Sequence, residues 1–139
     1  MVQTSELRTY LRGDRVFVTA QQFWLILTGF VMWTPAKERE ALITYGDLAM
    51  KAGYGDPRAG HMFGRQLGII GNFCLQNDLP ALNSVVVTQH SRKPGVEVVT
   101  ATERTVPEEQ RLVLNFDWYL VAAPSTGMLR KVWQSMDKS

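Results

Sequence analysis

The stretch that decides the predicted fold is ITYGDLAMKAGYGDPRAGHMFGRQLGIIGNFCLQNDLP, residues 43–80. Near its start, Thr44 stands three residues before Asp47, which is the spacing of a helix capping box. We therefore expect a short helix from this point through Lys51. The glycines within residues 53–55 then predict a turn.

A second helix is predicted directly after this turn. Asp56 can cap it, and Pro57 can take its first position, where the missing N–H of proline costs nothing. The pattern continues to about Asn77, and the sequence Asn-Asp-Leu-Pro then stops it. Two helices joined by a glycine-containing turn are typical of a helix-turn-helix, here with its second helix over residues 57–77.

A β-hairpin is predicted after the two helices. Residues 82–89 (LNSVVVTQ) and 96–100 (VEVVT) are rich in β-branched side chains and flank the turn sequence HSRKPG at 90–95. Helix, turn, helix and hairpin in this order is the layout of a winged helix. The winged-helix core would occupy about residues 43–100.

Additional elements are expected on both sides of this core. Within residues 4–34 we predict a helix at 5–13, a strand at 14–18, and a helix at 20–33 capped by Thr19. Within residues 106–136 we predict a helix that opens at Val106 and a last helix that opens at Ser125. The predicted fold class is α+β and mainly helical: a winged helix-turn-helix core with extra N-terminal and C-terminal helices, in a single domain over residues 1–139.

The length and composition indicate a folded globular protein. A chain of 139 residues that is 45% hydrophobic is long enough to bury a core and too apolar to be disordered. Its net charge of +2 does not by itself favour a particular partner. The most apolar stretch, residues 23–33, is shorter than the ~20 residues that cross a membrane, so we expect a buried helix and no membrane association.

The single cysteine and the two histidines argue against a metal site. One cysteine cannot form an internal disulfide or a multi-cysteine zinc site, and it suits a reducing cytoplasm, where we expect the protein to reside. His61 and His90 have no carboxylate or cysteine at a ligand spacing. Cys74 falls on the apolar side of the predicted second helix, so we expect a buried structural thiol.

Basic side chains lie on one side of that second helix. At about 100° per residue, Arg58, His61 and Arg65 form a narrow stripe opposite the apolar residues. Such a stripe is either a nucleic-acid contact or the ordinary solvated face of an amphipathic helix. The predicted wing adds Arg92 and Lys93. Four cations against Asp78 alone between residues 57 and 95 give this segment a charge of +3, the asymmetry that phosphate binding needs.

At these residues the sequence resembles a known family. ITYGDLA at 43–49 and PRAGHMFG at 57–64 are similar to the winged-helix DNA-binding half of the alkylguanine-DNA alkyltransferases and the alkyltransferase-like proteins. The resemblance covers about residues 43–87. It places Tyr45 at the family's tyrosine and His61 at its base-displacing arginine. Asn83 takes the place of the acceptor cysteine, so the resemblance implies the fold and not alkyl transfer.

The functional expectation follows from these features. We expect a non-catalytic protein that contacts duplex DNA through the helix at 57–77 and the wing at 90–95, with six contact residues: Tyr45, Arg58, His61, Arg65, Arg92 and Lys93. No catalytic triad, carboxylate pair or phosphate-binding glycine loop can be recognised, so no enzyme activity and no cofactor are expected. One alternative is a protein-interaction module, such as an adaptor or inhibitor encoded by a phage or mobile element. It would be favoured if any of the four tryptophans, otherwise expected in the core, were exposed. Another is recognition of altered bases without repair, which predicts a pocket beside Tyr45 and Asn83.

Overall fold

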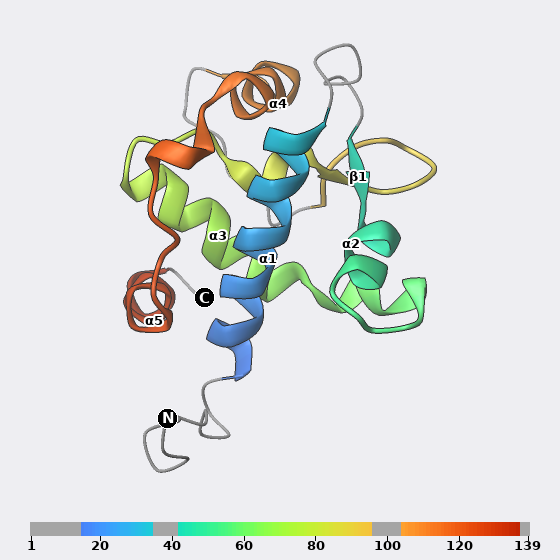
Figure 1. The fold of residues 1–139 in the computed structure, drawn as a ribbon, viewed down its shortest axis with the longest axis horizontal. Coiled ribbons are helices and arrows are strands. Elements are labelled where there is room, and N and C mark those ends of the chain that lie inside the picture. The colour runs from blue at the N-terminus through green and yellow to red at the C-terminus, as the bar shows by residue number, and fades with distance from the viewer. Residues whose placement is uncertain (1–14, 35–41, 96–103, 137–139) are drawn as a thin grey trace, which may run out of the picture.

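The computed structural model describes residues 15–34, 42–95 and 104–136. Figure 1 shows helix α1 (Arg15–Trp33) running through the middle of the molecule, with α2 (Tyr45–Lys51) on one side and α5 (Thr126–Ser135) on the other. Helix α3 (Gly64–Gln76) crosses α1, and α4 (Val106–Asn115) lies near one end of it. Within these ranges the fold is mainly helical, as predicted.

Strands make a small contribution to the described fold. Strand β1 (Ile43–Thr44) pairs in parallel with β2 (Val86–Val87), with Ile43 opposite Val86 and Thr44 opposite Val87. The 3₁₀ helix η5 (Leu82–Val85) occupies the start of the segment predicted as a strand, so that part of the prediction was wrong. The other predicted hairpin strand, 96–100, lies outside the described residues, as does the predicted helix at 5–13.

The first helix begins earlier than the sequence predicted. Residues 15–18, taken for part of a strand, form the first turn of α1, and Thr19 lies inside the helix instead of capping it. Phe17 and Ala20 are buried in register with the later core residues of α1. Burial along one helical face therefore outweighs the β-propensity of the Val-Phe-Val sequence.

The predicted helix over 57–77 is two helices. The 3₁₀ helix η4 (Pro57–Met62) and α3 are separated at Phe63, whose φ and ψ are −94° and 3°. Phe63 is buried and packs its ring 4.5 Å from that of Phe23. The tighter 3₁₀ turn and this anchor give η4 a direction of its own, so the basic stripe does not continue onto α3.

Three of the predicted helix starts, at Thr44, Val106 and Ser125, are confirmed. Thr44 accepts the Asp47 N–H through its hydroxyl at 3.0 Å at the start of α2. Thr105 and Glu108 form a complete capping box at α4, and Ser125 caps α5. These contacts join residues three positions apart, which is why a sequence pattern can predict them.

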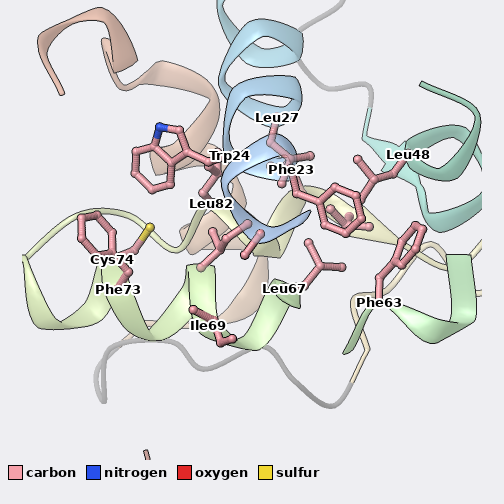
Figure 2. Close-up of a cluster of buried hydrophobic side chains, with 14 of the residues drawn as sticks. Phe23, Trp24, Leu27, Leu48, Phe63, Leu67, Ile69, Phe73, Cys74 and Leu82 are labelled. Atoms are coloured by element: carbon pink, nitrogen blue, oxygen red, sulfur yellow. The ribbon is translucent and has the colours of Figure 1, made fainter. Parts of the chain in front are cut away.

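The core lies between α1, α3 and the segments that flank them. Figure 2 shows Phe23, Trp24 and Leu27 of α1 meeting Leu67 and Phe73 of α3, among further buried side chains. Trp118, in the 3₁₀ helix η6 (Trp118–Leu120), packs edge-on against Trp24 with 5.6 Å between ring centroids.

The remaining tryptophans correct the expectation that all four are core residues. Trp133 is half-buried, whereas Trp33 is 78% exposed at the end of α1.

Helix α1 is long and apolar enough to cross a membrane by length and composition alone. In the fold, 33% of that segment is buried.

Candidate nucleic-acid interface

A cavity of about 550 Å³ lies between α2, η4, the start of α3 and the loop of residues 88–95. We call it the Tyr45 cavity, because Tyr45 lines it together with Arg58 and His61. Thr88, Gln89 and Gly95 close its other side. The site therefore joins segments at 44–46, 57–64 and 88–95, the first and last of which are more than 40 residues apart in sequence.

Tyr45 connects the two sides of this cavity. It is the first residue of α2, fixed by the Thr44 cap, and its hydroxyl oxygen accepts the backbone N–H of Gly95 at 2.8 Å. This hydrogen bond joins residues 50 positions apart and holds the loop against α2. The tyrosine is thus a structural part of the cavity wall.

Close packing sets the position of η4 beside α2. A Cβ atom on Gly60 would lie 2.4 Å from the carbonyl oxygen of Tyr45, so only glycine allows this approach. At the start of η4, the Asp56 carboxylate accepts the backbone N–H of Arg58 at 2.9 Å. The cap and the glycine contact together place Arg58 and His61 at the cavity.

Arg58 is paired with the residue that caps its own helix. Its guanidinium donates to both carboxylate oxygens of Asp56, at 2.9–3.2 Å. The side chain of Arg58, and then its backbone N–H, lower the pKa of Asp56 below the ordinary value of 3.8. Asp56 is therefore ionised at neutral pH and offsets much of the charge that Arg58 brings to the cavity.

Arg65 does not join the other predicted site residues. Its guanidinium carbon lies 5.3 Å from the ring centroid of Trp133, a cation–π contact with α5. Its neighbour Gly64 lines the Tyr45 cavity, but the arginine side chain extends toward α5. The break at Phe63 separates Arg65 from Arg58 and His61.

The loop of residues 88–95 is a closed turn with two exposed cations. The N–H of Thr88 donates to the Lys93 carbonyl at 2.9 Å, and the N–H of Arg92 donates to the Thr88 carbonyl at 3.0 Å. The hydroxyls of Thr88 and Ser91 also bond to each other. Arg92 has a φ of 57°, a left-handed conformation that normally favours glycine.

Arg92 and Lys93 line a second cavity of about 430 Å³, which we call the loop cavity. Gly95 lines both cavities, so the two are neighbours. The far wall comes from the start of α4, where the Gln110 amide donates to the Ser84 carbonyl at 2.8 Å. Five of the six predicted site residues therefore border two adjacent cavities.

Asn83 does not line either cavity. It is fully buried, and its amide atoms have no hydrogen-bond partner among the described residues. The expected pocket beside Tyr45 is present, whereas Asn83 packs against Gly71 of α3.

Cys74 is buried, as predicted. Burial raises the pKa of its thiol to about 12, which makes it a poor nucleophile near neutral pH.

The sequence did not indicate a buried ion pair at the start of α4. Glu109 is 1% exposed, and Arg104 Nε lies 2.7 Å from its carboxylate oxygen. Its neighbour Glu108 completes the capping box with Thr105, so the two adjacent glutamates have different roles. No group of three or more potential metal ligands occurs within the described ranges.

Neither a family model nor a curated protein nor a solved structure matches this chain.

Proposed function

We propose that this chain is a non-catalytic winged-helix protein that binds duplex DNA at the Tyr45 cavity and the loop cavity. The observation that carries the proposal is the convergence of Arg58 and His61 with the cationic loop of residues 88–95. In this proposal η4 and the start of α3 face the duplex, and the loop serves as the wing. Arg92 and Lys93 contact phosphates.

The expected salt dependence of binding follows from the number of cations on this face that can contact phosphates. Asp56 offsets Arg58, and Arg65 extends toward α5, so about two or three phosphates are neutralised by this face. The logarithm of the binding constant should then fall against the logarithm of salt concentration with a slope of about −2 to −3. Between 50 and 200 mM salt, slopes of this size amount to roughly a 16–64-fold loss of affinity.

The test is a fluorescence-anisotropy titration of duplex DNA at several salt concentrations. The double variant Arg92→Ala, Lys93→Ala should bind more weakly and flatten the salt slope by about 2. The matched control is Arg15→Ala, Lys131→Ala, which removes the same charge from exposed positions on α1 and α5. Equal losses in both variants, or no binding of wild type to any duplex at low salt, would overturn the proposal.

The volume of the Tyr45 cavity favours a second candidate function, the recognition of an altered base without repair. A cavity of about 550 Å³ falls within the ~300–1,000 Å³ range of small-ligand sites. This function requires tighter binding to a duplex carrying an alkylated guanine than to the unmodified duplex. It also requires that Tyr45→Ala removes this preference; equal affinities for the two duplexes in the wild type would leave only the first function.

A further inference from the structure

One face of the molecule combines exposed apolar side chains with a groove. Leu25 and Trp33 of α1 are 56% and 78% exposed, and Tyr119 and Leu120 of η6 are 70% and 80% exposed. We call these four residues the apolar face. Between them a groove of about 300 Å³ runs between α1 and residues 118–123.

The walls of this groove are held in place. At one end the Gln21 side-chain amide donates to the Pro124 carbonyl at 3.0 Å, and at the other the Trp33 indole N–H donates to the Tyr119 hydroxyl at 2.7 Å. The Thr28 hydroxyl donates to the Trp24 carbonyl at 2.9 Å. Because these donors already have partners, covering the apolar face leaves none of them unsatisfied.

Charge is absent from the sequence of both walls. Residues 16–33 contain no Asp, Glu, Lys or Arg, and neither do residues 118–124. Exposed helices normally carry charged side chains on their solvent side. A Cβ atom on Gly29, in the middle of α1, would meet no atom within 4 Å, so another helix can approach closely there.

We propose that the apolar face binds a second copy of this chain and forms a two-fold symmetric dimer. A two-fold contact places the same patch against itself, so the patch must contain both a groove and a projecting side chain. This face has the groove, with Leu120 projecting beside it and Leu25 on its wall. Two uncharged faces do not repel one another, and a net charge of +2 per chain adds little long-range repulsion.

The available area fits a dimer of modest affinity. An aromatic side chain can bury about 150–250 Å², so Trp33 and Tyr119 together offer roughly 300 Å² per copy. The two exposed leucines and the groove walls add to this area, against the ~800 Å² per partner of a standard interface. We therefore expect dissociation in the micromolar range. A groove of this size suits one side chain of the second copy.

Sedimentation equilibrium of the full chain from low to high micromolar concentration tests the proposal. The wild type should change from monomer to dimer over this range. Leu120→Glu and Leu25→Glu should each raise the dissociation constant at least ~10-fold, since each places a charge in the apolar contact. The control is Met50→Glu on α2, which introduces the same charge at a half-exposed apolar residue outside the apolar face.

Far-UV circular dichroism of each variant shows whether it remains folded, and the high exposure of the substituted residues predicts that it does. A wild type that stays monomeric throughout overturns the proposal, as does a dimer that tolerates both glutamates. Binding of the monomer to phosphatidylcholine vesicles would assign the apolar face to a membrane surface instead. The dimer does not depend on DNA binding, so anisotropy with the same variants tests the two proposals separately.

Discussion

At the scale of single residues, a substitution of Arg92 should weaken DNA binding without lowering the free energy of unfolding. The φ of 57° at Arg92 costs a residue with a side chain roughly 1–2 kcal/mol, which glycine avoids. Arg92→Gly should therefore keep the free energy of unfolding unchanged or raise it by up to ~1 kcal/mol, because the greater freedom of glycine in the unfolded chain offsets part of the gain. DNA affinity should fall, and the salt slope should flatten by about 1.

Urea unfolding and anisotropy on the same samples measure both effects. Arg92→Lys is the matched control, since it keeps the charge and the backbone conformation and should retain most of the binding. A glycine variant that binds duplex DNA like the wild type would show that Arg92 is not a phosphate contact.

Asp56 limits the charge at the Tyr45 cavity, and this can be tested by removing its charge alone. In Asp56→Asn the side-chain oxygen can still accept the Arg58 N–H, because asparagine caps helices as well as aspartate does. The Arg58 guanidinium is then free to neutralise a phosphate. We expect a few-fold tighter binding at low salt and a salt slope steeper by about 1.

The control for this gain is Asp78→Asn, which removes one negative charge at an exposed residue after α3. Asp78 has a φ of 55°, which asparagine tolerates well, so the substitution should not destabilise the fold. Tighter binding in both variants would reflect net charge alone and would contradict a specific effect at Arg58.

At the scale of elements, the contact between α3 and η5 depends on Gly71. A Cβ atom at this position would lie 2.6 Å from both amide atoms of Asn83, which is fully buried. Gly71→Ala should therefore destabilise the protein by about 1–3 kcal/mol through overpacking. Adding Asn83→Ala should recover most of this loss, because the clashing amide group is removed.

Denaturant unfolding of the two single variants and the double variant measures this coupling. Gly29→Ala, measured where the protein is monomeric, is the control: its Cβ meets nothing within 4 Å, and alanine in a helix interior should stabilise by roughly 0.5–1 kcal/mol. Independent, additive effects of Gly71→Ala and Asn83→Ala would mean that the two residues are not in contact.

The sequence could predict features that depend on neighbouring residues, but not those that depend on contacts with distant parts of the chain. The helix caps at Thr44, Thr105 and Ser125 each depend on a residue three positions away, and the helix starts predicted at these places are confirmed. The strand predicted at 14–18 was wrong over residues 15–18, because Phe17 is buried and contacts Arg130 of the distant α5. Single-residue propensities do not contain that contact.

The break in the helix predicted over 57–77 had the same kind of cause. Phe63 packs against the rings of Phe23 and Tyr54, and Gly60 lies too close to the Tyr45 carbonyl for a side chain. The sequence grouped Arg65 with Arg58 and His61 by assuming one continuous helix. Arg58 and His61 line one cavity, as their spacing predicts, whereas the long-range contact at Phe63 separates them from Arg65.

At the scale of the whole molecule, the two proposed surfaces belong to different parts of the fold. The loop of residues 88–95 and α2 lie on the same side of Figure 1, whereas the apolar face is formed by α1 and η6. No residue lines both the Tyr45 cavity and the groove. The proposed dimer contact therefore uses residues other than those that line the Tyr45 cavity.

Cys74 lies in the core and makes the free energy of unfolding depend on pH in the alkaline range. Burial, and secondarily the charge of Glu109, raises the pKa of its thiol from 9.0 to about 12. In the unfolded chain the thiol ionises near 9, whereas the folded protein keeps the proton until about 12. Below pH 9 the protonated thiol of Cys74 therefore does not lower the free energy of unfolding. Between pH 9 and 12 the free energy of unfolding falls by up to ~1.4 kcal/mol per pH unit.

Comparison with Cys74→Ala isolates this effect, because the tyrosines and lysines titrate in both proteins. The variant should be less stable than the wild type by about 1 kcal/mol at neutral pH, since it lacks the buried sulfur. Above pH 9 this difference should shrink and then reverse, because only the wild-type unfolded state gains a thiolate. Urea unfolding followed by tryptophan fluorescence at neutral pH and at two values between 9 and 12 measures the difference. A difference that stays constant with pH would mean that the thiol ionises equally in both states, and that Cys74 is not held in the dry core between α3 and η5.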